Sequence, residues 1–346
     1  MPLQSAARSV VLPQPIAAWV WAEGMLVEAS KGRAPSRPVI AALIGLIVVI
    51  WAVNFIAAKV GLRYFPPLTM ASFRVCAAGV VMVPFYLVCS RLTAFGGGAS
   101  GELNGLRRGF TRRDVWTFLY LGFFGVSINQ FCFTMGLHFT SVSHSAVIVG
   151  MGPIYTLVLA VLLRLEKVTG HKAVGMAIAF VGIAVLASEH GISAHSPSLL
   201  GDAITMTGSV GFAMYAVLGK RVAGEYDALR MTAYNHFAGS LLVLPLAVRQ
   251  ACMLEREGSW RGVPWQGWAA ILYMALFGSA VAYVCYFWLL RYLEASQLSA
   301  FTYLLPVLAT ILGILTLGEK GSWMQVVGGV LALGGVYWIE SGRESR

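Results

Sequence analysis

Two segments of the chain, separated by a constant 153 residues, carry the same arrangement of residues. The first, Pro153–Gly182, reads PIYTLVLAVLLRLEKVTGHKAVGMAIAFVG, and the second, Pro306–Gly335, reads PVLATILGILTLGEKGSWMQVVGGVLALGG. Each starts with an apolar run that contains a proline, passes through a Glu-Lys turn and a hydroxyl residue, and ends in an apolar run with glycines seven residues apart. So many matches at one offset indicate an internal repeat.

The pattern within each copy predicts two helices joined by a short charged turn. Thr169 and Ser322 follow the Glu-Lys pairs at positions where a side-chain oxygen would cap the first amides of the next helix. Glycines seven residues apart lie on one helical face and would let a neighbouring helix approach closely. These residues therefore define the architecture, and helix packing explains them better than chemistry does.

The repeat extends upstream in each copy. At the same offset, Trp116–Cys132 falls on Ala269–Cys285. Further upstream the offset becomes 161 residues, because the first copy carries an additional glycine-rich, basic segment after residue 95. Such a segment is a flexible loop, so the two copies match on either side of it. Three pairs of positions correspond at the second offset: Asn54 with Tyr215, Lys59 with Lys220, and Arg74 with Asn235.

Composition places the chain in a membrane. Of its 346 residues, 58% are hydrophobic and only 12% are charged, which is about half the charged fraction of a soluble protein. A bilayer core of about 30 Å requires roughly 20 apolar residues per helix. Ten runs meet this requirement, approximately at residues 39–58, 67–89, 115–137, 142–164, 171–188, 199–219, 230–250, 266–290, 296–317 and 323–340.

The repeat and the basic residues together predict the topology. Each copy holds five runs, an odd number, so two copies of one fold would enter the membrane in opposite orientations, as in many secondary transporters. With the N-terminus inside, 18 Lys and Arg residues lie on the cytoplasmic side and 6 on the opposite side, as the positive-inside rule requires. We expect an all-α, multi-pass protein of the cytoplasmic (inner) membrane, with ten transmembrane helices in two inverted five-helix repeats and both termini cytoplasmic.

This topology divides the chain into five parts. Residues 1–38 are interrupted by prolines, and we expect a disordered cytoplasmic tail, with translation starting at either Met1 or Met25. A signal peptide does not fit, because prolines break the only candidate apolar core. The remaining parts are a first five-helix repeat at 39–188, a linker at 189–198, a second five-helix repeat at 199–340 and a cytoplasmic C-terminus at 341–346.

The sequence contains no motif for catalysis or cofactor binding. It lacks a P-loop, a G-x-S-x-G elbow, an H-E-x-x-H motif and a close pair of carboxylates inside an apolar run. Its five cysteines have no paired spacing, so they read as small apolar residues. The net charge of +10 is spread over loops, unlike a nucleic-acid-binding arm. We therefore expect no enzyme activity, cofactor, metal or nucleic-acid partner, but a small-molecule substrate and a lipid bilayer.

Polar residues inside apolar runs are costly in a membrane and indicate functional positions. Arg74 is the one firm charge well inside a run. It would reach the headgroups by snorkelling, hold a substrate carboxylate in a cavity, or brace a gate. For the other candidates the alternative is a hydrogen bond between helices. The candidate substrate-binding residues are Trp51, Asn54, Arg74, Gln130, Tyr215, Asn235, His236 and Tyr283.

At this point the chain resembles the drug/metabolite transporter superfamily, specifically the bacterial exporters with two EamA-type domains. The resemblance rests on Trp51–Gly61 followed by Pro66–Arg74, on Pro153–Lys167 and on Pro306–Lys320, and it covers residues 39–340. It implies ten helices in two inverted halves, a central cavity near the bilayer midplane, and export of amino acids or related metabolites from the cytoplasm. Amino-acid exporters, including those for aromatic amino acids, are most similar in pattern.

We therefore expect a secondary transporter that exports small metabolites, amino acids first among them, by alternating access. Pro153 and Pro306 remove backbone donors at corresponding places and are the candidate hinges. No acidic residue lies in the middle of a run, so proton antiport would depend on His144 or His236, and facilitated diffusion or exchange is the alternative. Two other classes stay open: a flippase for a lipid-linked metabolite and a non-transporting membrane subunit. The sequence leaves the solute and the oligomeric state open.

Overall fold

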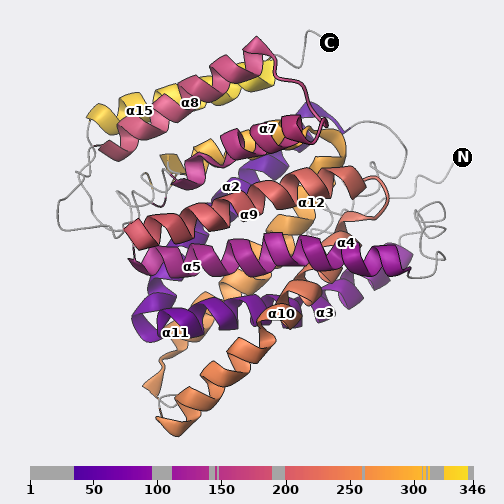
Figure 1. Ribbon diagram of the computed structural model, residues 1–346, viewed down its shortest axis with the longest axis vertical. Helices are drawn as coiled ribbons and strands as arrows, with labels where there is room; N and C mark the ends of the chain where they lie inside the picture. The colour runs from indigo at the N-terminus through magenta and orange to yellow at the C-terminus, as the bar shows by residue number, and fades with distance from the viewer. Residues whose placement is uncertain are drawn as a thin grey trace, which may run out of the picture.

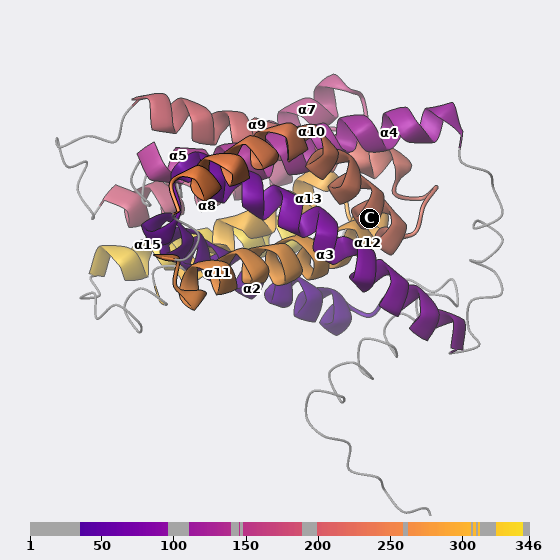
Figure 2. The ribbon, with the colours of Figure 1, turned by 90° about the horizontal axis from the view of Figure 1, so that it is seen from below.

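The computed structural model describes residues 35–95, 111–139, 145, 148–188, 199–258, 262–305, 307–308, 311 and 323–341. These residues are almost entirely helical, and they include no strand. Figure 1 shows most of the helices running in a similar direction, and Figure 2 shows them as one bundle. In chain order they are α2 (Arg37–Tyr64), α3 (Pro67–Phe95), α4 (Arg112–Gly122), η2 (Phe123–Ile128), α5 (Asn129–Phe139), α7 (Gly152–Leu162), α8 (Gly170–Ser188), α9 (Leu199–Val222), α10 (Ala228–Arg256), α11 (Trp265–Tyr273), η4 (Met274–Val281), α12 (Ala282–Tyr292), α13 (Ala295–Ala300), η5 (Phe301–Tyr303) and α15 (Trp323–Ser341).

The fold is that of a multi-pass membrane protein. Large apolar side chains such as Val80, Leu241 and Trp265 are exposed on the long helices, where lipid is their natural solvent. Two shorter apolar helices, Ile148–Leu162 and Val326–Ile339, have the same character. Within the described residues, five helical segments are long and apolar enough to cross a bilayer: Arg37–Tyr64, Pro67–Val88, Arg112–Phe139, Ala228–Arg256 and Trp265–Tyr292.

The fourth expected helix, residues 142–164, is interrupted in its described part. Residues 148–150 are helical, a turn follows at Met151, and α7 begins at Gly152. Pro153 lies in the first turn of α7, where its missing N–H group costs no hydrogen bond. The turn residue before the proline keeps helical backbone angles (φ −75°, ψ −10°), and the role of Pro153 as a hinge stays a prediction. Pro306, the corresponding candidate hinge, lies outside the described residues.

Two π-helical segments interrupt the third and eighth helices at corresponding positions. η2 ends at Ile128 and η4 ends at Val281. These two residues are 153 positions apart, so they correspond in the sequence repeat. A π-helical turn changes the backbone hydrogen-bond pattern and is frequent at functional sites. In η4 the carbonyl oxygen of Gly278 accepts a hydrogen bond from the indole N–H of Trp51 at 3.2 Å.

Glycines inside these π-helical segments leave space for the side chains of two candidate site residues, Tyr215 and Asn54. A Cβ atom on Gly125 would lie 2.1 Å from the Tyr215 ring, and one on Gly278 would lie 2.5 Å from Asn54 Oδ1. The two glycines correspond at the first sequence offset, and Asn54 corresponds to Tyr215 at the second. The same close contact is therefore made twice, in opposite directions between the two sequence repeats.

The close helix approach expected at the repeated glycines is present between α8 and α15. A Cβ atom on Gly182 would lie 2.4 Å from the backbone nitrogen of Ala332, and one on Gly335 would lie 2.4 Å from that of Ala179. In Figure 1 these two helices lie side by side at one end of the bundle. The repeated glycines therefore join a helix of one repeat to the corresponding helix of the other.

The predicted cap of α8 is also confirmed. The hydroxyl oxygen of Thr169 accepts a hydrogen bond from the amide of Lys172 at 3.3 Å, as an N-cap side chain does. Ser322, the corresponding residue before α15, lies outside the described residues. So do residues 1–34, 189–198 and 342–346, which hold most of the predicted tail, the linker and most of the C-terminal segment.

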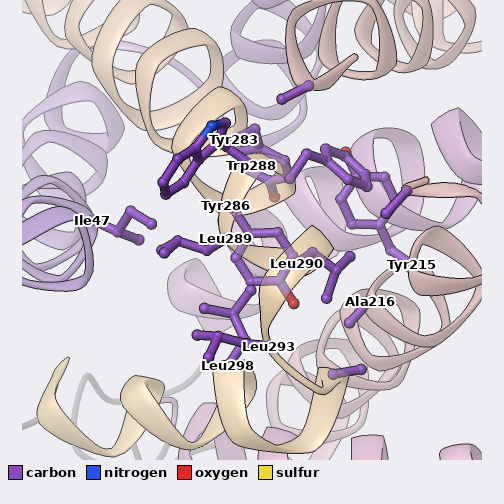
Figure 3. Packing of buried hydrophobic residues seen from close by; sticks show 14 of the residues in the cluster. Ile47, Tyr215, Ala216, Tyr283, Tyr286, Trp288, Leu289, Leu290, Leu293 and Leu298 are labelled. Atoms are coloured by element: carbon purple, nitrogen blue, oxygen red, sulfur yellow. The ribbon is translucent and has the colours of Figure 1, made fainter. Parts of the chain in front are cut away.

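The largest cluster of buried apolar residues lies where α2, α9, α12 and α13 meet. Figure 3 shows Leu289 and Leu290 of α12 between Ile47 of α2 and Tyr215 of α9. Between membrane helices such side chains stabilise the fold by van der Waals packing, because lipid tails are as apolar as the protein interior. The cluster therefore holds helices of the two sequence repeats together on one side of the site described next.

Candidate functional site

A cavity of about 90 Å³ lies between helices of both sequence repeats. It has room for several water molecules. α2, α3, α5 and α7 contribute residues from the first repeat, and α9, η4, α12, α13 and η5 contribute residues from the second. Most of its lining is aromatic or apolar, with a few hydroxyl and amide side chains, and Arg74 is the one charged residue among the described residues that line it.

Arg74 is held at the cavity by two residues of α5. Its side chain is buried, with 4% of the residue exposed. Nη1 donates to Thr134 Oγ1 at 3.1 Å, and Cζ lies 5.6 Å from the centre of the Phe133 ring. Nε has no hydrogen-bond partner among the described residues. The structure thus places the guanidinium at the cavity and not at the lipid headgroups, so the snorkelling alternative does not hold.

Aromatic rings form much of the remaining wall. Trp51 lies edge-on to Phe212, with ring centres 5.6 Å apart, and to Tyr283, at 5.8 Å. On the side of Arg74, Phe55 and Phe133 pack edge-to-face at 4.9 Å. Such pairs fix ring orientation and add about 0.5–1.5 kcal/mol each to the burial of the rings. The cavity therefore has rigid walls suited to an apolar group.

A chain of buried hydrogen bonds lies behind the cavity. The hydroxyl of Ser279 donates to Gln130 Oε1 at 3.1 Å, and Gln130 Nε2 lies 3.2 Å from His236 Nε2. His236 Nδ1 lies 2.8 Å from the carbonyl oxygen of Thr232. A carbonyl only accepts, so Nδ1 carries the proton and Nε2 accepts from the Gln130 amide. Both ring nitrogens of His236 are therefore satisfied in the neutral state.

The structure separates the eight candidate residues into two groups. Trp51, Asn54, Arg74 and Tyr283 line the cavity. Gln130, Tyr215, Asn235 and His236 lie behind it, where each belongs to a hydrogen bond between buried side chains. The residues of the second group thus lie where side chains pack and hold their neighbours in place. A role in substrate binding stays a prediction for all eight residues.

Sequence reasoning missed several lining residues. Asn129 accepts from the hydroxyl of Tyr283 at 3.1 Å and donates to the carbonyl of Gly208 at 3.0 Å. Thr205 and Thr302 also line the cavity. Hydroxyl residues are frequent in membrane helices, so these two carry no separate signal. Asn129 begins the helix after η2, and only the position of that π-helical segment singles it out.

At one end of the bundle, a cluster of charges connects the two sequence repeats. Lys172 Nζ lies 3.0 Å from Glu166 Oε2 and also contacts Glu294. Glu166 accepts hydrogen bonds from the backbone amide of Ser296, at 3.2 Å, and from its hydroxyl. The side chains of Glu166 and Lys172 are 4% and 8% exposed, so this ion pair is buried. We call these four residues the end cluster.

Further contacts tie the same end together. Lys220 Nζ donates to the carbonyl oxygens of Leu290 at 2.7 Å and of Leu293 at 2.8 Å, which lie at the C-terminal end of α12. Arg291 donates to the carbonyl of Tyr226 at 2.6 Å. Lys59, which corresponds to Lys220 in the first repeat, is exposed. These two corresponding lysines therefore differ in their surroundings.

Two surface contacts accompany the end cluster. Arg113 Nη2 lies 3.0 Å from Glu225 Oε1, and both side chains are at least one-third exposed. The Tyr226 hydroxyl donates to Asp114. Burial, together with this hydrogen bond, raises the pKa of Tyr226 well above its usual range. Each of these contacts joins α4 to the turn between α9 and α10.

The apolar cluster of Figure 3 separates the cavity from the end cluster. Along α12 the chain passes from Tyr283 at the cavity through buried Leu289 and Leu290 to Glu294. Along α2 the buried Ile44 and Ile47 precede Trp51 at the cavity. Along these helices, apolar side chains and then the end cluster therefore lie between the cavity and this end of the bundle.

The model of the EamA-like transporter family matches the chain twice, at residues 39–188 and 199–341. The chain therefore belongs to the EamA-like transporter family, within the drug/metabolite transporter superfamily, and carries two EamA domains. This membership agrees with the apolar helices and places the protein in the cell membrane.

Named relatives from bacteria and archaea cover most of the chain. The uncharacterized transporter YyaM of Bacillus subtilis is 28% identical over 82% of this chain and 87% of its own length. An uncharacterized transporter of Archaeoglobus fulgidus is 25% identical over 86% and 97%. A probable terminal-alkyne amino-acid exporter of Streptantibioticus cattleyicolor is 25% identical over 85% and 91%. One solved crystal structure, 16% identical, has a similar fold, with a TM-score of 0.63 over 88% of this chain and 96% of that chain.

Proposed function

We propose that the protein is a secondary transporter that exports amino acids or related small metabolites, aromatic ones included, across the cytoplasmic membrane by alternating access. The observation that carries the proposal is a cavity lined by both repeats, with apolar packing and the end cluster joining the repeats at one end of the bundle. A relative named as a probable amino-acid exporter supports the substrate class.

The proposed topology has ten transmembrane helices in two inverted repeats, residues 39–188 and 199–340, with both termini in the cytoplasm. The reciprocal contacts of Gly125 with Tyr215 and of Gly278 with Asn54 support it, because a two-fold relation between inverted halves generates each contact twice. In this topology the end cluster faces the cytoplasm, and its buried ion pair supports a state that is closed on the cytoplasmic side.

In this mechanism the cavity opens to the cytoplasm when the end cluster separates. The break at Met151, just before Pro153, supports this region as a hinge, because interrupted membrane helices commonly bound transporter sites. The paired π-helical segments η2 and η4 supply two further places where the helices can change pitch.

We propose exchange or facilitated diffusion as the coupling mode, in preference to proton antiport. Both ring nitrogens of His236 are engaged in hydrogen bonds, and a proton added to Nε2 would face the Gln130 amide. His144, the other candidate proton carrier, lies outside the described residues. Proton antiport through His236 would require Gln130 to turn its amide group.

Counterflow in proteoliposomes of the purified protein tests the function. Vesicles preloaded with unlabelled amino acids should accumulate labelled amino acids from outside, in an amount that depends on the protein. A pH gradient should leave the rate unchanged if the coupling assignment is right. Failure of every small solute, together with movement of a lipid-linked metabolite, would favour a flippase; movement of nothing would favour a non-transporting subunit.

A further inference from the structure

We propose that the cavity selects α-amino acids with an uncharged, apolar side chain, and that Arg74 binds the α-carboxylate. This inference rests on the transport function proposed above and assigns its specificity. Three properties of the lining carry it: a single cation, a set of hydroxyl groups restricted to accepting hydrogen bonds, and aromatic walls.

The cation is incompletely paired. Among the described residues no Asp or Glu forms an ion pair with Arg74, and the side chain that accepts a hydrogen bond from it is the neutral Thr134. The Thr134 hydroxyl donates to the carbonyl of Gln130 at 3.0 Å, so its oxygen only accepts from Arg74. A buried guanidinium without a counter-ion is costly. Its planar donors match a carboxylate, so a bound carboxylate would supply the missing charge.

The hydroxyl groups of the lining present acceptors. Thr205 donates to the carbonyl of Gly201 at 2.9 Å, Ser299 to that of Ser296 at 3.0 Å, and Thr302 to that of Ser299 at 2.8 Å. Each hydroxyl has one proton. With that proton used within the helix, the oxygen retains lone pairs for a donor from a ligand. The α-ammonium group of an amino acid is such a donor.

The aromatic walls decide the side chain of the substrate. Trp51, Phe55, Phe212 and Tyr283 offer ring surface but no charge to the space between them. An apolar side chain is favoured there at about 25 cal/mol per Å² of surface removed from water. A second carboxylate would find no second cation in the described lining, and a cationic side chain would meet Arg74 with no carboxylate to offset it.

The test measures which parts of one molecule the cavity recognises. Proteoliposomes of the full chain are preloaded with phenylalanine, and uptake of labelled phenylalanine is competed with five compounds: leucine, phenethylamine, 3-phenylpropionate, glutamate and arginine. We expect leucine to compete. We expect phenethylamine, which lacks the carboxylate, and both charged amino acids to compete about tenfold less well or worse. 3-Phenylpropionate, which retains the carboxylate, should compete better than phenethylamine.

The variant Arg74→Gln should lose the preference for phenylalanine over phenethylamine, because the carboxylate then has no cation. Arg74→Lys should restore part of it, since the charge remains without the forked geometry. Arg249→Gln, at an exposed arginine of α10, is the matched control, and it should keep the parent preference for phenylalanine over phenethylamine. The preference is a ratio within each variant, so it is independent of the amount of active protein.

The outcomes separate this inference from the proposed function. Exchange of phenylalanine with equal competition by phenethylamine would overturn the role of Arg74 while the transport function stands. An Arg74→Gln variant that keeps the parent ratio would do the same. Absence of exchange for every compound in the parent protein would overturn both.

Discussion

Replacing Lys172 by Met tests whether the end cluster holds the cytoplasmic end closed. The change removes the ion-pair partner of Glu166, whose side chain is only 4% exposed, and leaves Lys220 as a cation that still acts on the carboxylates of Glu166 and Glu294. Breaking a buried pair from one side costs about 3–5 kcal/mol. Ser296 still donates two hydrogen bonds to Glu166, so we take the lower end, about 3 kcal/mol. Glu294, with 38% of its side chain exposed, adds at most about 1 kcal/mol.

This cost applies to the closed state, because the carboxylates regain water when the end opens. A change of about 3 kcal/mol shifts the ratio of open to closed protein about 100-fold. The assay uses a single cysteine at Leu298, a buried residue of the apolar layer, in a chain whose own five cysteines are replaced by Ala or Ser. In inside-out vesicles, a membrane-impermeant maleimide should label this cysteine faster after Lys172→Met, by up to that factor.

Two controls define the result. Lys172→Arg keeps the charge and should label at nearly the parent rate. Arg113→Gln breaks an exposed pair at the same end, with side chains 66% and 36% exposed, and should change the rate only slightly, since such pairs contribute about 0–1 kcal/mol. A labelling rate for Lys172→Met within twofold of the Arg113→Gln rate would refute the assignment of the end cluster as the closure.

Three further predictions concern the helices. Gly182→Ala should lower the free energy of unfolding in detergent by about 1–3 kcal/mol, because the new Cβ would overlap α15. A Cβ at Gly334 would have nothing within 4 Å, so Gly334→Ala should be neutral or raise that free energy by up to about 1 kcal/mol. Equal melting temperatures for the two variants would contradict this. Trp51→Phe removes the indole donor to η4 and should slow counterflow severalfold without loss of folded protein, a result that size-exclusion chromatography and uptake check together. Replacing Pro153 and Pro306 together by Ala should slow efflux with normal membrane insertion, and unchanged efflux would argue against the hinge.

Much of the fold could be predicted from the sequence, because composition and repeats act over long segments. The apolar runs coincide with helices wherever the structure describes them, and the glycines of α8 pack against α15 as expected. The interruption at Met151 could not be predicted with the same certainty, since a proline is compatible with both a helix interior in a membrane and a first helical turn. The π-helical segments have no sequence signal that distinguishes them from ordinary helix.

The site was predictable only in part. Arg74 stood out because a charge inside an apolar run is costly, and Asn54 because it is a polar residue inside a run and corresponds to Tyr215 of the second repeat. The contacts between Lys172 and Glu294, 122 residues apart in the chain, depend on how the two repeats pack, which no local pattern contains. Asn129 was missed for the same reason, because its role depends on the turn of η2 that precedes it.

The glycine contact between α8 and α15 has a consequence for how the chain can be divided. Each helix presents a bare strip of backbone that only the other fills. A polypeptide ending after residue 188 would carry such a strip without its complement, and one starting at residue 199 would carry the complement. Two fragments cut in this way should associate in one membrane through these helices and restore a working protein.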